Sequence, residues 1–312
     1  MSSLVTILIN NYNYGQFLRD AIESALHQTY TNTEVIVVDD GSTDHSRDII
    51  ASYGSRIVPV LKGNGGQASA FNAGFAASHG EWILFLDSDD RLAPQKAEFI
   101  LSYARRFRAA GFAAHDLDYC DAENRPVSHS GSVLYQNCEL TDQRQNIRKG
   151  KSTVRLPATS ALAVRRDVLS QILPMPEGIT ITADNYIKTA ALSLTPVLLS
   201  PDRLAVQRLH DRNRYTRLVL SEESRLQQYL INAQIIFHLR RNFPSLSKLA
   251  WKTYGRTLFQ LAALKGPRAK EISKQIRSSY SPFDYSPLCC FYVCAAFFKS
   301  SMSNRVPAVD IH

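Results

Sequence analysis

The sequence predicts an α/β protein with a mostly parallel sheet that is flanked by helices. Two observations predict it. Over the first 110 residues, short apolar runs rich in β-branched residues alternate with segments of helical spacing. Three of these runs end in polar clusters, at Asn10–Asn13, Asp39–Ser42 and Asp87–Asp90. Because open parallel sheets bind ligands beyond the carboxyl ends of their strands, we expect the three clusters to meet in one crevice.

Four buried strands are expected in this part of the chain. Each is a run of apolar residues bounded by polar or turn-forming residues. They lie at residues 4–9, 34–38, 57–61 and 82–86. Pro59 in the third run indicates an edge strand, because proline cannot donate a ladder hydrogen bond.

Helices are expected between and after these strands, because apolar residues there recur every three to four positions. Three of them lie at residues 15–28, 67–78 and 94–107. Another follows the second strand and is capped by Ser42, Thr43 or Asp44. Gly63 to Gly66 form a loop. Residues 112–220 are less regular, with a strand entering a helix in LPATSALAVRRDVL and a helix opening in ITADNYI. From residue 221 the pattern is helical, so we divide the chain into residues 1–220 and a helical C-terminal region, 221–312.

The composition fits a globular protein, with 45% hydrophobic and 21% charged residues and a net charge of +8. That charge suits anionic partners such as nucleic acid, a membrane surface or phosphorylated substrates. Five cysteines without a C-x-x-C pair favour a reducing compartment, and Cys289, Cys290 and Cys294 favour buried thiols over a metal site. The N-terminus resembles a strand rather than a signal peptide. The apolar run 287–298 is shorter than the roughly 20 residues that span a bilayer. It is readable as a core helix, which short apolar runs commonly form, or as a segment in a membrane interface. We therefore expect a cytoplasmic protein, with contact at the inner membrane face left open.

The acids of FLDSDD suit a hard cation. Mg²⁺ and Mn²⁺ prefer carboxylate oxygens and commonly share their ligand shell with substrate phosphates. Such a metal would relieve the repulsion between Asp87, Asp89 and Asp90; the alternative is a solvated helix cap before Pro94. An aromatic ring beside carboxylates, as at Tyr12, suits a nucleobase. Neither a G-x-G-x-x-G motif nor a P-loop motif occurs, so a Rossmann dehydrogenase and a P-loop kinase are not indicated.

Five ordered segments together resemble family 2 glycosyltransferases of the GT-A fold. They are VTILINNYNYGQFLRDAIESALHQTY, EVIVVDDGSTD, NGGQASAFNAGFAASHGEWILFLDSDD and, more loosely, ADNYI and RLHDRN. The resemblance implies a GT-A sheet with a C-terminal helical appendage. It also implies transfer of a sugar, with inversion, from a nucleotide-diphosphate sugar, usually of UDP, to an acceptor hydroxyl in glycan or polysaccharide synthesis, with Mn²⁺ or Mg²⁺ as cofactor.

The resemblance also implies roles for individual residues. Asp184 falls at the position of the catalytic base, and Asp87, Asp89 and His210 fall at metal or diphosphate contacts. The nucleotide sugar would be bound by Asn11, Tyr12, Asp39, Asp40, Asn64, Gly65, Gln67, Asn72, Asp87 and Ser88. From the residues alone, the alternative for Asp184 is a helix cap, and the alternative for His210 is part of a solvated basic loop. Arg208, Arg212 and Arg214 are alternative diphosphate ligands.

Three positions depart from the family pattern. Asn10-Asn11 replaces a common Pro-Thr or Pro-Ser, Phe71 replaces an Arg, and Ala183 replaces the Glu that often precedes the base. Ala183 keeps open a non-catalytic sugar-nucleotide-binding or scaffold protein of the same fold. Nucleic acid is disfavoured as a partner because acids at the ligand end of the sheet would repel phosphates. The acceptor is left open among a glycan, a lipid-linked molecule and a protein.

Overall fold

A computed structural model describes residues 3–128, 133–211, 213, 222–264 and 266–278. The chain forms two compact units. Unit 1 consists of Met1–Asp142 and Arg155–Arg212, and unit 2 of Gln143–Val154 and Asn213–His312. The cysteine trio and the apolar run 287–298 lie outside the described residues.

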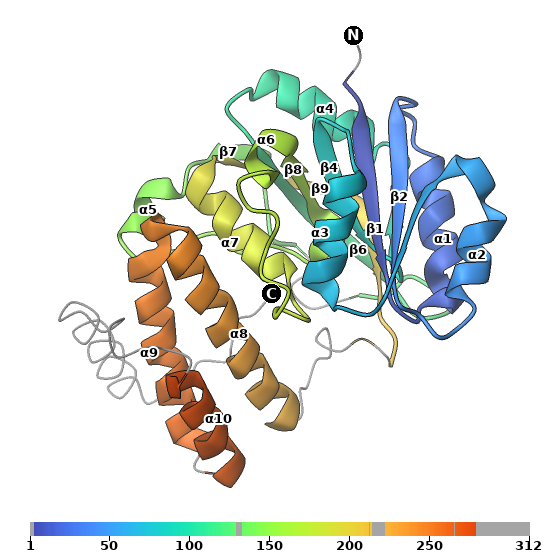
Figure 1. Cartoon of the computed structure of the whole chain (residues 1–312). Helices are drawn as coiled ribbons and strands as arrows, with labels where there is room; N and C mark the ends of the chain where they lie inside the picture. The colour runs from blue at the N-terminus through green and yellow to red at the C-terminus, as the bar shows by residue number, and fades with distance from the viewer. Residues whose placement is uncertain (1–2, 129–132, 212, 214–221, 265, 279–312) are drawn as a thin grey trace. The chain divides into compact units, whose positions relative to one another are not determined.

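Unit 1 is built on one mixed sheet with the strand order β3-β2-β1-β4-β8-β6-β9-β5, and β7 pairs with β9 (Figure 1). Its strands are β1 (Val5–Asn11), β2 (Thr33–Asp40), β3 (Val58–Lys62), β4 (Trp82–Asp87), β5 (Arg91–Leu92), β6 (Phe112–Cys120), β7 (Glu139–Thr141), β8 (Leu162–Arg165) and β9 (Val197–Arg208). The four predicted strands are confirmed as β1 to β4, which pair in parallel. β3 ends the path, as Pro59 indicated, but the prediction that it is buried is wrong, because Val58 and Leu61 of this edge strand are exposed.

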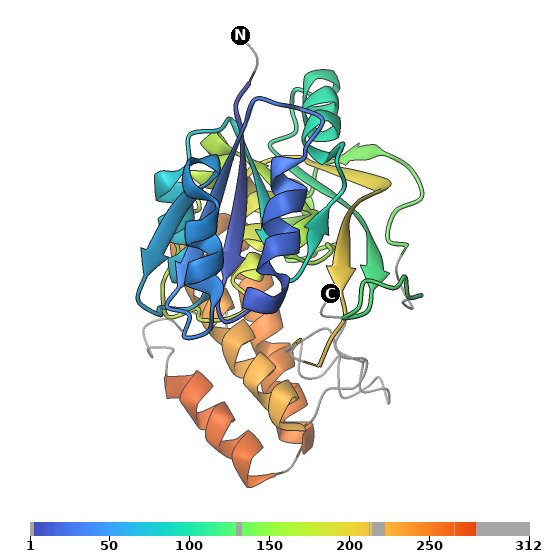
Figure 2. The ribbon, with the colours of Figure 1, turned by 90° about the vertical axis from the view of Figure 1, so that its right-hand side faces the viewer.

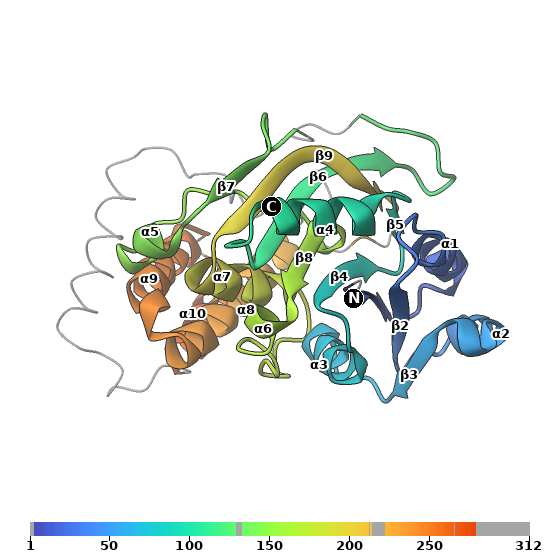
Figure 3. The same ribbon diagram turned by 90° about the horizontal axis from the view of Figure 1, so that it is seen from above.

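The helices of unit 1 lie on both faces of this sheet. They are α1 (Gly15–Leu26), α2 (Ser46–Ser52), α3 (Gln67–Ala77), α4 (Lys96–Arg106), α6 (Arg166–Leu169) and α7 (Asp184–Leu194), with short 3-10 turns at Gly54–Arg56 and Thr159–Ala161. Figure 3 shows α3 on one side of β1 and β2, and α1 and α2 on the other. The predicted helix over 15–28 ends two residues earlier, at Leu26. α2 begins at Ser46 with His45 at the N-cap position, so the predicted cap at Ser42, Thr43 or Asp44 is wrong. Asp44 still contacts the helix start, because its Oδ1 accepts from the Ser46 N–H at 3.0 Å.

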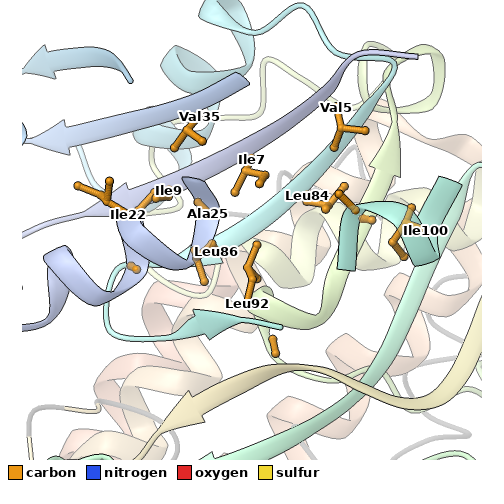
Figure 4. Packing of buried hydrophobic residues seen from close by; sticks show 14 of the residues in the cluster. Val5, Ile7, Ile9, Ile22, Ala25, Val35, Leu84, Leu86, Leu92 and Ile100 are labelled. Carbon is orange, nitrogen blue, oxygen red and sulfur yellow. The ribbon is translucent and has the colours of Figure 1, made fainter. Parts of the chain in front are cut away.

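Alternate residues of the central strands enter different cores. Val5, Ile7 and Ile9 of β1 belong to the buried cluster that also contains apolar residues of α1, α2, α4 and β4 (Figure 4). Leu8 points to the opposite face, where α3 packs so closely that a Cβ on Gly74 would lie 2.7 Å from Leu8 Cδ1. Both faces are therefore covered, which explains why β1 is mostly apolar from Val5 to Ile9, without alternation of apolar and polar residues.

Unit 2 contains α5 (Arg144–Arg148), α8 (Glu222–Asn242), a 3-10 turn at Pro244–Leu246, α9 (Ser247–Leu264) and α10 (Pro267–Ser278). The last three α-helices are the orange and red ones in Figure 2. Their shared core includes Tyr229 of α8, Trp251 and Tyr254 of α9, and Ile272 and Ile276 of α10. Among the described residues, no helix has the length and apolar character needed to cross a membrane.

Candidate functional site

The acidic turn that follows β4 is held from behind by buried side chains. Asp90 accepts hydrogen bonds from Ser160 Oγ at 2.6 Å and from the Arg208 N–H at 2.9 Å. The same Ser160 Oγ accepts from the Asp87 N–H at 3.0 Å. Lys96 Nζ, fully buried, donates to the Ser160 carbonyl at 2.7 Å. Asp90 is thus a buried anchor of the turn, and Ser160 ties both ends of the turn to the start of β8.

Three carboxylates converge in front of this anchor. Burial, together with the nearby charges of Asp89 and Asp184, raises the pKa of Asp87 to about 8. Burial, with the charges of Asp89 and Asp87, also raises the pKa of Asp90 well above its usual range. The β4 end and the start of α7, far apart in sequence, therefore face one another across a site crowded with carboxyl groups.

His210 lies beside Asp89. Its Nε2 lies 3.0 Å from Asp89 Oδ2. Its ring packs against the rings of Phe17, at 4.7 Å between centroids, and Tyr14, at 5.6 Å. The imidazole is 5% exposed, so its packing against these rings fixes the orientation of a ring nitrogen next to a carboxylate.

Asp184 lies in the first turn of α7, with Ala183 at the N-cap position. Gln67, at the start of α3, positions this turn: its Oε1 accepts from the Ala183 N–H at 2.8 Å, and its own N–H donates to the Thr180 carbonyl at 2.9 Å. Lys188 Nζ lies 2.6 Å from Asp184 Oδ2, one helical turn further along. Lys188 was not predicted, although an acid and a lysine four positions apart on a helix signal such a pair.

Asp39 is buried at the end of β2 and is fully engaged. Its carboxylate accepts from Arg47 Nε at 2.8 Å, Asn11 Nδ2 at 2.9 Å and the Ser42 N–H at 3.1 Å. Burial opposes ionisation of this group, but the hydrogen bonds from Ser42, Arg47 and Asn11 outweigh it and lower its pKa. Within the described part of the chain, Asn11 Oδ1 is a buried acceptor without a hydrogen-bond partner.

Asp40 organises the glycine loop that precedes α3. It accepts from Lys62 Nζ at 2.6 Å, from the Gly65 N–H at 3.0 Å and from the Gly66 N–H at 2.7 Å. Gly66 has a φ of 84°, and a Cβ there would lie 2.7 Å from Thr180 Cα. Only glycine fits this conformation and this close approach. Asp40 thereby links the end of β2 to the segment that carries Asp184.

The remaining predicted residues differ in their surroundings. Tyr12 is 40% exposed at the end of β1, as an aromatic platform requires. Ser88 is buried, and its N–H donates to the Asn10 carbonyl at 3.3 Å. Asn64 borders the turn after β2, since a Cβ on Gly41 would lie 2.5 Å from the backbone nitrogen of Asn64. Asn72 exchanges two hydrogen bonds of 2.8 Å with the Met175 backbone.

Of the three arginines considered for diphosphate, only Arg208 lies among the described residues. Its side chain is buried. Arg208 Nη2 lies 2.7 Å from Asp20 Oδ2, and Arg208 Cζ lies 4.5 Å from the centroid of the Phe17 ring. Arg208 therefore supports the α1 side of the site, and its guanidinium is committed to Asp20 rather than to a ligand.

The donor atoms at the site fit a hard divalent cation. Asp89 and His210 supply an oxygen and a nitrogen that already lie side by side, and Asp87 lies in the same repulsive field. In the part of the chain that is described, no group of three His, Cys, Asp or Glu residues is assembled closely enough to enclose a metal. Substrate oxygens would therefore have to complete the ligand shell, as they commonly do for Mg²⁺.

A comparison with protein families shows to which family the chain belongs. The model of glycosyl transferase family 2 matches residues 6–173, more than half of the chain. The chain belongs to this family. An uncharacterized glycosyltransferase of Nostoc sp. is 35% identical over 218 residues, which are 68% of this chain and 66% of that protein. The chain thus spans just under two thirds of that relative.

Solved structures of glycosyltransferases share the fold. TarS of S. aureus, residues 1–349 in complex with UDP-GlcNAc, superposes with a TM-score of 0.58 at 15% identity, over 99% of this chain and 94% of that one. The mannosyltransferase PcManGT of Pyrobaculum calidifontis, in complex with GDP-Man and Mn²⁺, gives a TM-score of 0.51 at 18% identity, over 96% and 88%. The predicted GT-A fold with C-terminal helices is confirmed.

Proposed function

We propose that this chain is a metal-dependent, inverting glycosyltransferase. It would move a sugar from a nucleotide-diphosphate sugar, with UDP as the nucleotide, to an acceptor hydroxyl in glycan or polysaccharide synthesis. The observation that carries the proposal is the convergence of Asp87, Asp89 and Asp184 at the carboxyl edge of the sheet. A cytoplasmic location, and a glycan, lipid-linked or protein acceptor, belong to the same proposal.

The donor half of the site lies around the ends of β1 and β2. The exposed ring of Tyr12 offers a stacking surface for a base, and the buried Asn11 Oδ1 offers an acceptor for a ring N–H. Relatives of the same fold support the nucleotide: TarS has been solved with UDP and with UDP-GlcNAc. Asp39 and Asp40 shape this half by fixing Asn11 and the glycine loop.

Asp87, Asp89 and His210 would hold Mn²⁺ or Mg²⁺, and PcManGT with GDP-Man and Mn²⁺ supports a metal in this fold. The bound cation would neutralise charge on the departing diphosphate. Asp184 would take the proton from the acceptor hydroxyl, since inversion by single displacement needs one base. Lys188 would orient the Asp184 carboxylate through their 2.6 Å contact.

The test is a calorimetric titration of UDP, with GDP and dTDP as alternatives, in Mn²⁺ and in EDTA. We expect UDP to bind only with Mn²⁺, and Asp89→Ala to abolish that binding. Asp48→Ala, an exposed carboxylate on α2, serves as the matched control and should bind as the wild type does. Failure of the folded protein to bind any of the three nucleotides would overturn the proposal.

One alternative is favoured by a specific feature. Ala183 at the N-cap and the Lys188 ion pair suit a sugar-nucleotide-binding protein in which Asp184 has a structural role. It predicts metal-dependent UDP binding without hydrolysis or transfer of any UDP-sugar. Measurement of UDP release from a panel of UDP-sugars, with and without candidate acceptors, separates the two functions.

A further inference from the structure

The two units carry net charges of opposite sign. Unit 2 contains 19 lysines and arginines against 5 aspartates and glutamates, a formal charge of +14. Unit 1 contains 17 against 23, a formal charge of −6. The moderate net charge of +8 for the whole chain is therefore the sum of a strongly basic unit and an acidic one. Such a segregated charge attracts polyanions to unit 2 alone.

Within unit 2, cations gather where α5 packs against α9. Lys248, Lys252 and Arg256 follow one another at four-residue intervals along α9 and so share one face of that helix. The end of α5 and the residues after it lie against this face, as α5 and α9 do in Figures 1 and 3. We refer to six of these residues together as the basic cluster: Arg148, Lys149, Lys151, Lys248, Lys252 and Arg256.

Gly150 makes this concentration of charge possible. It has a φ of 70°, and a Cβ there would lie 2.9 Å from Lys248 Cγ and 3.1 Å from Lys252 Cδ. Lys252 Nζ donates to the carbonyls of Lys149 at 3.3 Å and Gly150 at 3.2 Å. The backbone at Gly150 thus passes close to α9 and brings Lys149 and Lys151 beside Lys248 and Lys252. Lys248, Lys252 and Arg256 are like charges one helical turn apart, an arrangement that by itself destabilises a helix.

We propose that the basic cluster is a docking surface for an anionic lipid bilayer. Arg148, Lys149, Lys151 and Arg256 are exposed and can reach lipid phosphates. Each lysine or arginine at an anionic membrane surface strengthens binding about fivefold, so these four exposed cations provide a substantial anchor. This inference does not depend on the proposed glycosyltransferase activity, because it concerns a different unit of the chain.

A bilayer fits better than a nucleic acid or another soluble polyanion. The sequence of unit 2 includes the apolar run PLCCFYVCAAFF at 287–298, which is uncharged and contains four aromatic residues. A lipid interface accepts such a segment, and stable attachment commonly requires a basic patch together with an apolar element. A dissolved polyanion offers this run no partner.

The experiment is co-sedimentation of the full chain with vesicles of phosphatidylcholine, with and without phosphatidylglycerol, at low and high salt. Two triple variants remove the same charge from exposed positions. The cluster variant is Lys149→Gln, Lys151→Gln and Arg256→Gln; the control, on α10, is Lys270→Gln, Lys274→Gln and Arg277→Gln. Lys248 and Lys252 are left intact because they pack against Gly150. A heparin column and a single-stranded oligonucleotide test soluble polyanions.

We expect binding only to vesicles with phosphatidylglycerol, declining with salt as the charges are screened. The cluster variant should bind on the order of 100-fold more weakly, from about fivefold for each cation. The α10 variant should lose less than about tenfold on the same scale. Mn²⁺-dependent UDP binding should be equal in both variants. The inference is overturned by equal losses in the two variants, by equal binding to neutral vesicles, or by tighter binding to heparin or the oligonucleotide than to the vesicles.

Discussion

The imidazole Nε2 of His210 lies 3.0 Å from Oδ2 of Asp89, although 121 positions of sequence separate the two residues. β9 carries His210 to this place, because β9 runs parallel to β6 and ends at the same edge of the sheet as β4. α1 then fixes the ring through Phe17 and Tyr14. An oxygen and a nitrogen donor therefore meet at the point where the proposed metal is needed.

His210→Ala should weaken Mn²⁺ binding in the presence of UDP by roughly 10- to 100-fold, the usual cost of disturbing a metal site. Loss of one donor and of the hydrogen bond that orients Asp89 both contribute. Calorimetric titration of Mn²⁺ at saturating UDP measures the effect. His45→Ala, at the exposed N-cap of α2, is the histidine control. Unchanged Mn²⁺ affinity in His210→Ala would remove this residue from the proposed metal site.

Ser160→Ala should lower the free energy of unfolding by about 1–3 kcal/mol, because it leaves the Asp87 N–H and an oxygen of the buried Asp90 without their partner. Urea denaturation measures it. Ser102→Ala removes a hydroxyl that bonds only its own helix on the surface and should cost less than about 0.5 kcal/mol. Equal costs in the two variants would show that Ser160 does not hold the acidic turn.

The parallel half of the sheet could be predicted because both of its faces are covered, so its strands are continuous apolar runs. β6 was missed, since His115, Asp116 and Asp118 interrupt its apolar pattern and only the folded chain supplies their surroundings. The acids at the strand ends were predicted from their positions. Lys96 and Ser160 were not, because nothing in a local pattern shows that a lysine in a helix turns inward to a carbonyl 64 positions away.

Gly66→Ala should disturb both stability and the site. The left-handed φ costs a residue with a Cβ about 1–2 kcal/mol, and the Cβ would meet Thr180, which belongs to the segment leading to Asp184. Gly63→Ala is the matched control, since a Cβ there meets nothing within 4 Å. Urea denaturation and UDP-sugar turnover are measured together. A Gly66→Ala protein that matches Gly63→Ala in both would contradict the proposed coupling between the glycine loop and α7.

Glu34 should make the stability depend on pH. Burial raises its pKa, but hydrogen bonds from Thr6 Oγ1 and the His79 and Gly80 N–H groups outweigh this and lower the pKa below 4.5. A lowered pKa stabilises the fold above the unfolded value, and this contribution is lost as pH falls through the folded value. Glu34→Gln should therefore cost about 1 kcal/mol near pH 7 and progressively less below about pH 4.5.

Urea titrations of the wild type and Glu34→Gln at neutral and acidic pH measure this difference. Glu177→Gln, at an exposed position, should show no difference from the wild type at either pH. A cost of Glu34→Gln that is the same at both pH values would mean that the ionised carboxylate contributes nothing beyond the shape of the side chain.

Asp184→Asn separates catalysis from binding. The amide keeps the size of the side chain but cannot accept a proton, so transfer to an acceptor should fall by about 10²- to 10⁴-fold, the range for loss of a general base. The Mn²⁺-dependent affinity for UDP should stay within about threefold, because in the proposed site Asp184 serves the acceptor and the nucleotide lies against the ends of β1 and β2. Asp167→Asn, an exposed carboxylate paired with Arg165, is the control. If Asp184→Asn retains full turnover, another group takes the proton; if it loses UDP binding instead, Asp184 belongs to the donor site.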